Sequence, residues 1–235
     1  MGIRALTFDV IGTLFDWFGT FSDGVPPLAE KYGLTIDPGA FAIEACEGYA
    51  RRVALANSEN RWTPPDTILR DSIADLLSRD RRPSFAEVDD FFAIWRTLEP
   101  WADVPSALWA LRENFTLAIL SNMSIATQSA LIAHSDLPFN RTLSAETVQA
   151  YKPNAAVYQM AIASLGLCPN EIVMISAHWL ALIAAQRRGM MTAFVARPLE
   201  FGSSSSVDTS ADPGFDISVS SFAELAGELD ARAKV

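Results

Sequence analysis

The sequence predicts an α/β fold in which a doubly wound parallel sheet carries a helical insertion after its first strand. Residues 3–9 form a short apolar run that ends in an acid, and after Pro100 apolar runs alternate with helical patterns. Between these parts, residues 16–98 carry apolar residues at intervals of three and four, interrupted by turn-forming residues. Strands that alternate with helices at this spacing are typical of a parallel sheet covered on both faces.

The composition limits the classes of function. The 235 residues fit one large domain, or a core with a smaller insert, and half of them are hydrophobic. No run approaches about 20 uninterrupted apolar residues, so we expect no membrane span. The net charge of −10 predicts no binding to nucleic acid. The isolated Cys46 and Cys168, and the absence of a signal-like N-terminus, indicate a cytoplasmic protein.

The first half of the chain divides into a strand and a helical insertion. Residues 3–9 form the first strand, which brings Asp9 to the carboxyl end of the sheet before Gly12 and Thr13 end the strand. Within the insertion we expect helices over residues 40–57, 66–79 and 85–97. We expect breaks at five places: Asp23-Gly24, Pro26-Pro27, Asp37-Pro38-Gly39, Trp62-Thr63-Pro64-Pro65 and Arg82-Pro83. The predicted domains are a core of residues 1–15 and 99–235 and a cap of residues 16–98.

The second half of the chain repeats strand and helix. Strands are predicted at residues 117–121, 172–176 and 192–195, with a weaker one at 216–219. Helices are predicted between and after them, at residues 105–114, 125–134, 154–165, 180–188 and 222–232. The polar residues 202–213 are expected to form a surface loop.

Polar side chains follow several of these strands. Because the carboxyl ends of parallel strands share one crevice, these side chains are expected to converge. They are Asp9, Thr13, Ser121, Asn122, Lys152, Ser176 and His178. In such a site Asp9 is the nucleophile, Lys152 keeps it ionised, and Ser121 with Asn122 binds an anion or stabilises developing charge.

Four segments, in order and spacing, resemble the four motifs of the haloacid dehalogenase superfamily: FDVIGTLFDW, LAILSNMS, YKPNAAVY and VMISAHWLALIAAQRRGM. Together with TAFVARPLEFG, they are most similar to the L-2-haloacid dehalogenases (type II). The resemblance implies a Rossmann-like core with an inserted cap. It also implies a reaction in which Asp9 displaces halide from a small-molecule carboxylate with inversion, and water then hydrolyses the aspartyl ester to a 2-hydroxy acid.

The resemblance also implies roles for individual residues. Thr13 and Lys152 position the nucleophile, Ser121 and Asn122 receive the substrate carboxylate, and Ser176 supports Lys152. Tyr158 matches a supporting position behind the site. Residues beside the site and at the entry to the cap complete the candidate substrate pocket: Val10, Ile11, Trp17 and Trp62. A homodimer is the oligomeric state that the resemblance suggests.

The residues favour displacement at carbon over phosphate transfer. Magnesium-dependent phosphatases of the superfamily carry a second acid two residues after the nucleophile, where this chain has Ile11. No Asp or Glu lies between Ser176 and Gly189, whereas Mg²⁺ is usually held by one or two carboxylates. We therefore expect no metal and no other cofactor.

The chain departs from the dehalogenase pattern at two positions. The acid that helps activate water is replaced by Ala181, and the arginine of the cap falls near Ala45 in this register. The nearest arginines, Arg51 and Arg52, come roughly two turns later. Either His178 is the base, with Arg51 as a substitute for the arginine, or the pocket serves another substrate.

Three functions therefore stay open. The first is a metal-independent 2-haloacid dehalogenase. The second is an enzyme that uses the same nucleophile on a different electrophile, such as a strained-ring azetidine carboxylate or a natural product. The third is a binding protein that has kept the fold without the activity, against which the retention of both Asp9 and Lys152 speaks.

Overall fold

A computed structural model describes residues 2–79, 81–203 and 214–233 of the chain. Its centre is a parallel sheet of six strands in the order β5-β4-β1-β6-β7-β8. The strands are β1 (Ala5–Phe8), β4 (Thr116–Ser121), β5 (Arg141–Ser144), β6 (Ile172–Ser176), β7 (Met191–Val195) and β8 (Ile217–Val219). The predicted α/β fold with a parallel sheet is confirmed.

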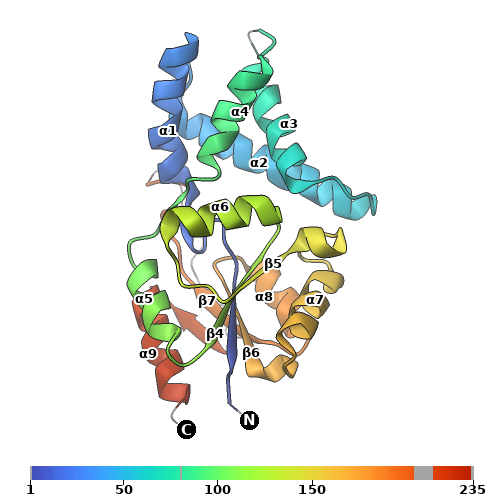
Figure 1. The fold of residues 1–235 in the computed structure, drawn as a ribbon, viewed down its shortest axis with the longest axis vertical. Coiled ribbons are helices and arrows are strands. Elements are labelled where there is room, and N and C mark those ends of the chain that lie inside the picture. Colours follow the sequence, from blue (N-terminus) through green and yellow to red (C-terminus); the bar gives the residue numbers. More distant parts are fainter. Residues whose placement is uncertain (1, 80, 204–213, 234–235) are drawn as a thin grey trace.

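Helices cover both faces of this sheet (Figure 1). Successive side chains of a strand point to opposite faces, so in β1 Leu6 and Phe8 enter one core while Ala5 enters the other. The first core includes α5 (Val104–Leu111), α6 (Ile125–Ser135) and α9 (Phe222–Ala233). The second includes α7 (Ala155–Leu165) and α8 (Trp179–Gln186). Short 3₁₀ turns precede α7 and β6, at Ala145–Val148 and Pro169–Glu171.

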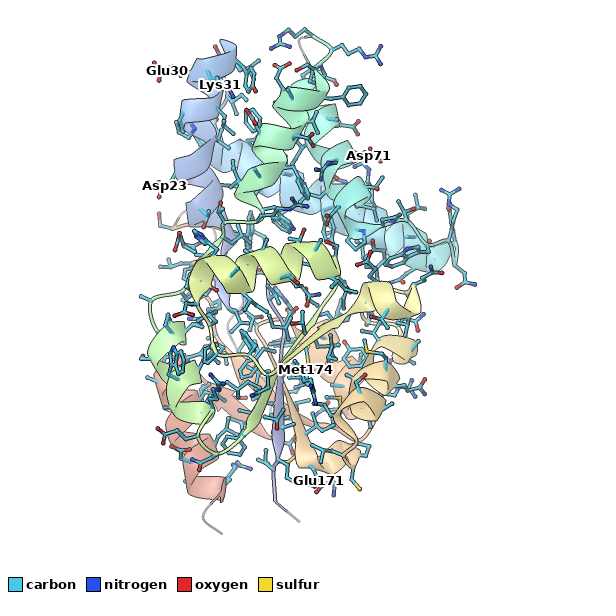
Figure 2. The ribbon with its side chains drawn as sticks, viewed as in Figure 1. Asp23, Glu30, Lys31, Asp71, Glu171 and Met174 are labelled. Carbon is cyan, nitrogen blue, oxygen red and sulfur yellow. The ribbon has the colours of Figure 1, made fainter. Side chains whose placement is uncertain are left out.

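Four further helices lie beyond one end of the sheet (Figure 1). They are α1 (Trp17–Tyr32), α2 (Pro38–Ser58), α3 (Pro65–Leu77) and α4 (Phe85–Ile94). A short antiparallel pair, β2 (Phe15–Asp16) and β3 (Glu99–Pro100), joins the two ends of this segment. Figure 2 shows Glu171, which directly precedes β6, at the end of the molecule opposite to these helices. The carboxyl ends of the strands therefore face α1–α4.

Two of the predicted chain breaks, at Asp23-Gly24 and at Pro26-Pro27, are wrong. Helix α1 continues through both of them. Its residues Trp17, Phe21, Val25 and Ala29 recur every four positions and are buried, so packing outweighs the backbone hydrogen bonds that proline removes. Gly24 also lies against Ile94, where an added Cβ would be only 3.1 Å from that side chain.

Strand β5 has no counterpart in the sequence prediction. It is a four-residue edge strand whose first two residues are exposed, so it lacks the apolar run that indicates a buried strand. The predicted loop at residues 202–213 lies largely outside the described residues, which stop at 203 and resume at 214. None of the helices within the described ranges is both long and apolar enough to cross a membrane.

Candidate active site

Asp9 follows β1 directly, and its carboxylate receives four hydrogen bonds. Oδ1 accepts from Lys152 Nζ at 2.5 Å, and Oδ2 interacts with His178 Nδ1 at 2.8 Å. Oδ2 also accepts from the hydroxyls of Thr13, at 3.3 Å, and Ser176, at 3.2 Å. The backbone N–H of Asp9 donates to Ile175 O, which continues the pairing of β1 with β6 and fixes where the carboxylate points.

Lys152 reaches Asp9 from a loop that side chains hold in place. Its ammonium also donates to Leu120 O at 2.8 Å, at the end of β4. Its backbone N–H donates to Asn122 Oδ1 at 2.7 Å. Asn57, on α2, accepts from the N–H of Tyr151 and donates to the O of Tyr151. The loop is therefore anchored both to the sheet and to the inserted helices.

The charges around Asp9 keep it ionised. Burial by itself would raise the pKa of Asp9, but the Lys152 ammonium and the hydrogen-bonded His178 outweigh this effect and hold the pKa far below its usual range. A carboxylate that is almost fully buried and yet charged is unusual unless it is paired. Perturbed carboxylates of this kind gather at functional sites.

His178 lies between two carboxylates. Its Nδ1 is 2.8 Å from Asp9 Oδ2 and its Nε2 is 2.8 Å from Glu200 Oε1. A carboxylate beside each ring nitrogen favours a proton on both of them. Although burial lowers the pKa of His178, the charge of Glu200 and the bonds to both carboxylates raise it to about 10. His178 is thus an imidazolium in the free protein.

Glu200 comes from the segment after β7 and is buried, with 5% of its side chain exposed. It lies directly over Gly12, whose φ of +74° favours glycine. A Cβ at position 12 would collide with the Glu200 carboxylate. The backbone conformation therefore favours glycine at position 12, and any other residue there would also displace the Glu200 carboxylate.

Asp9 opens into a cavity of about 580 Å³ between the strand ends and α2. Side chains from α2 recur along one face of that helix and form its wall: Cys46, Ala50, Val53, Ala54 and Asn57. Trp95, Met123, Leu180 and Phe201 make the remaining lining predominantly apolar, and Asp9, Lys152, His178 and Glu200 lie together at its polar end. A largely apolar cavity with a few convergent polar groups is the usual form of a small-molecule site.

Comparison with known proteins places this site in a family. The model of the haloacid dehalogenase-like hydrolases matches residues 3–186, which include Asp9, Lys152 and His178. The chain belongs to the haloacid dehalogenase-like hydrolase family. It is 36% identical over 202 residues to the (S)-2-haloacid dehalogenase of Pseudomonas sp. (strain YL), with 83% of each chain covered.

Solved structures agree with this haloacid dehalogenase-like fold over nearly the whole chain. The L-2-haloacid dehalogenase PA0810 superposes with a TM-score of 0.93 at 31% identity, covering 98% of this chain and 100% of that one. The defluorinating L-2-haloacid dehalogenase Rha0230 has the same TM-score at 27% identity, with coverages of 97% and 95%.

The structure brings Asp9 together with six other site residues that were predicted from the sequence. Four of them contact its carboxylate: Thr13, Lys152, Ser176 and His178. The other two, Ser121 and Asn122, line the same cavity. Ser176 contacts Asp9 rather than Lys152, since its hydroxyl lies 3.2 Å from Asp9 Oδ2. Asn122 lines the cavity, but its amide oxygen accepts from the backbone of Lys152. The Ser121 hydroxyl accepts from Met123 N at 3.1 Å and lines the cavity. Ile11 also lines the cavity.

The lining of the cavity does not include five other side chains predicted to contact the substrate or to support its pocket: Val10, Trp17, Arg51, Trp62 and Tyr158. Val10 and Trp17 are buried in the first core, where Trp17 packs against Phe201, itself a lining residue. Tyr158 is buried in the second core. Trp62 stacks on Tyr151 with a centroid distance of 4.8 Å.

No arginine among the described residues lines the cavity. Arg51 follows the cavity-facing Ala50 by one position, about 100° around the helix, and pairs with Glu47 in solvent. Arg52 donates to Ser72 and pairs with Asp75 on α3. Neither side chain reaches the cavity in this structure.

The donor groups fit a metal poorly. Within the described residues, no group of three or more His, Cys, Asp or Glu side chains is arranged to hold a metal ion. Both oxygens of Asp9 are engaged by Lys152, Thr13, Ser176 and His178, and Ile11 is the side chain two positions later. Mg²⁺ requires oxygen ligands that are free to coordinate it.

Three residues near the site escaped the sequence analysis: Glu200, Tyr49 and Asn57. Tyr49 OH donates to Asn122 O at 3.2 Å, from α2 to the end of β4. Glu200 stands five residues after β7, so inspection of the segment that follows each predicted strand would have found it. Tyr49 and Asn57 carry no such signal, because their partners lie 73 and 94 residues away in sequence.

Proposed function

We propose that this haloacid dehalogenase-like hydrolase cleaves the carbon–halogen bond of a small 2-halogenated carboxylic acid through an ester with Asp9. The observation that carries the proposal is the ionised Asp9 carboxylate, paired with Lys152 and His178, at the polar end of an apolar cavity. The relatives named 2-haloacid dehalogenases support the choice of substrate class.

In the first step, Asp9 attacks the carbon that bears the halogen from the side opposite to the halogen. A carbon–oxygen bond forms, the carbon–halogen bond breaks, and the halide leaves with its electron pair. Lys152 and Thr13 hold the attacking carboxylate in position, and the Ser121 hydroxyl is available to the substrate carboxylate. Water then hydrolyses the ester and returns Asp9 as a carboxylate.

We also propose that residues 16–98 act as a cap that closes this site. Three residues of this segment support that role by contacting the core beside the site, two through their side chains and one through its backbone carbonyl. Tyr49 bonds to Asn122 and Asn57 bonds to Tyr151. The carbonyl of Thr63 accepts from Tyr151 OH at 2.7 Å.

A second candidate keeps the nucleophile but changes the electrophile. The described lining of the cavity contains no arginine, and its two cations, Lys152 and His178, are both paired with Asp9. No cation in this lining is left to bind another anion. A strained-ring acid of the azetidine carboxylate type releases no halide that such a cation would have to receive, so we propose it as an alternative substrate for the same ester chemistry.

The test is halide release from racemic 2-chloropropanoate with EDTA present. We expect stoichiometric chloride and 2-hydroxypropanoate, no effect of EDTA, and complete loss of both products in Asp9→Asn. A single turnover in ¹⁸O-labelled water is expected to place the label in Asp9, as mass spectrometry of its peptide would show. An adduct on Asp9 from an azetidine acid without chloride turnover would favour the second candidate. Absence of both turnover and adduct with either compound would contradict both candidates and leave a binding protein.

A further inference from the structure

His178 and Glu200 form a hydrogen-bonded pair beside Asp9 that takes no part in the first step of the proposed reaction. Dehalogenases resembling this chain carry a water-activating acid at the position of Ala181, so the hydrolytic step needs another base. We propose that His178, oriented by Glu200, is the base that activates water for hydrolysis of the Asp9 ester. The inference rests on the proposed function and extends it to the second step.

The position of His178 suits this step. Its Nδ1 is 2.8 Å from Asp9 Oδ2, an atom of the group that becomes the ester. Its Nε2 lies 2.8 Å from Glu200 Oε1. Glu200 thereby orients the ring in the way that the aspartate of a Ser-His-Asp triad orients its histidine. About 40% of the His178 side chain is exposed, so both water and a departing proton have access to the ring.

The other ionisable groups at the cavity are poorly suited to be this base. The Lys152 ammonium donates to Asp9 and to Leu120 O, and an ammonium has no lone pair to accept a proton. Burial, with a smaller effect of Glu200, raises the pKa of Cys46 to about 12, so its thiol stays protonated at neutral pH. Burial likewise raises the pKa of the Tyr49 hydroxyl well above 10. Glu47 is paired with Arg51 in solvent.

Formation of the ester itself converts His178 from an acid to a base. In the free protein Nδ1 carries a proton because it faces the charge of Asp9. When Asp9 becomes a neutral ester that charge disappears, and the Nδ1 proton passes to solvent. This is the one proton that accompanies halide in the overall reaction. Glu200 keeps the remaining proton on Nε2, so the free lone pair is on Nδ1, beside the ester.

The hydrolytic step then balances. Water attacks Cγ of Asp9 and gives one proton to Nδ1. The bond from Cγ to the ester oxygen breaks, and the departing alkoxide takes that proton to become the alcohol. The second proton of the water is at first on the new Asp9 carboxyl group. It then passes to Nδ1. The carboxylate–imidazolium pair of the free protein is restored.

The test separates the two steps with 2-bromopropanoate in rapid-quench kinetics. In His178→Asn and Glu200→Gln we expect a burst of one bromide per protein, then steady turnover reduced about 10²–10⁴-fold, the range for loss of a general base. The rate of the burst is expected to change less than about tenfold. Mass spectrometry should find the ester on Asp9 in both variants, and Glu200→Asp should restore part of the turnover.

The chain offers a matched control. His134, the other histidine, pairs with Glu99 at 2.9 Å on the surface. His134→Asn and Glu99→Gln are expected to keep wild-type burst and turnover. Loss of burst and turnover together in His178→Asn and Glu200→Gln, without an ester, would overturn the inference while leaving the proposed function intact, provided that the wild type releases bromide. Unchanged turnover in both variants would also overturn it. Absence of bromide release from the wild type would instead contradict the proposed function.

Discussion

Asp9 illustrates how one residue can be buried and reactive. Burial opposes its ionisation, yet Lys152 and His178 lie at hydrogen-bond distance on separate oxygens and more than offset that effect. The same contacts that keep the carboxylate charged also aim it. A nucleophile held in this way needs no further activation by a base, unlike a serine hydroxyl, because it is already an anion.

The pairing of His178 predicts a specific dependence of stability on pH. Its pKa in the folded protein is about 10, whereas its ordinary value is 6.5. A pKa that is raised by folding stabilises the folded state fully below about pH 6.5, and this stabilisation is lost as the pH rises through 10. We therefore expect His178→Asn to lower the Tm most at pH 6, less at pH 8 and least at pH 10.

Thermal unfolding of the two proteins at these three pH values would check this prediction. The groups that determine the effect are Asp9 and Glu200, which bond to the ring, and Lys152, which bonds to Asp9. A difference in Tm that stays constant, or grows between pH 6 and pH 10, would mean that the imidazolium is not stabilised by these carboxylates.

The residues that lie around Asp9 could be predicted from the sequence, but not all of their contacts. Asp9 and Lys152 stand in ordered motifs after strands, and parallel topology brings such positions together. Whether Ser176 bonds to Lys152 or to Asp9 depends on the rotamer and on a fraction of an ångström, which no spacing encodes. Glu200 reaches His178 through a loop after β7, so the pair exists only once the strands are packed side by side.

At the scale of elements, Arg197 connects three parts of the core. Its Nε donates to Thr13 O at 3.1 Å, in the loop that follows Asp9. Its Nη1 bonds to both carboxylate oxygens of Asp103, at 3.0 and 3.1 Å, next to the start of α5. Asp103 also accepts from Phe222 N, the first residue of α9. One buried arginine thus ties the nucleophile loop to two helices of the core.

We expect Arg197→Met to lower the free energy of unfolding by about 2 kcal/mol, because it leaves the partly buried Asp103 carboxylate without its charged hydrogen-bond partner. Arg197→Lys is expected to lose less, since it keeps the charge but not the two parallel bonds. Urea denaturation with an unchanged m value would measure both effects. Arg51→Met is a suitable control, because its exposed ion pair with Glu47 is worth less than about 1 kcal/mol. Equal losses in Arg197→Met and Arg51→Met would contradict this view of Arg197.

Elements were predictable where a local pattern and burial agreed. The strands at residues 172–176 and 192–195 correspond to β6 and β7, whose residues are almost all buried. The same rule missed β5, at the edge of the sheet, and interrupted α1 at its prolines. In both cases neighbours distant in sequence determine the structure: β4 supplies hydrogen bonds to β5, and Ile94 of α4 packs against Gly24.

At the scale of the whole molecule, the inserted helices determine what the site can hold. Four of the α2 side chains that line the cavity are small or apolar (Cys46, Ala50, Val53 and Ala54), beside the polar Glu47, Tyr49 and Asn57. The arginines of α2 point to solvent or to α3. The cavity of about 580 Å³ is larger than a two- or three-carbon acid requires. The space beyond the reacting carbon is therefore apolar and suited to an alkyl chain.

This arrangement predicts that kcat/KM rises along the series 2-bromopropanoate, 2-bromobutanoate and 2-bromohexanoate. Each buried methylene contributes about 0.8 kcal/mol, which corresponds to roughly a fourfold gain until the cavity is filled. Ala54→Trp places a ring in the wall of the cavity. We expect this variant to lower kcat/KM more for 2-bromohexanoate than for 2-bromopropanoate. Because the chemistry at Asp9 is the same for all three acids, the series isolates the contribution of the cavity. A kcat/KM that falls steadily with chain length would show that the cap closes this space when substrate binds.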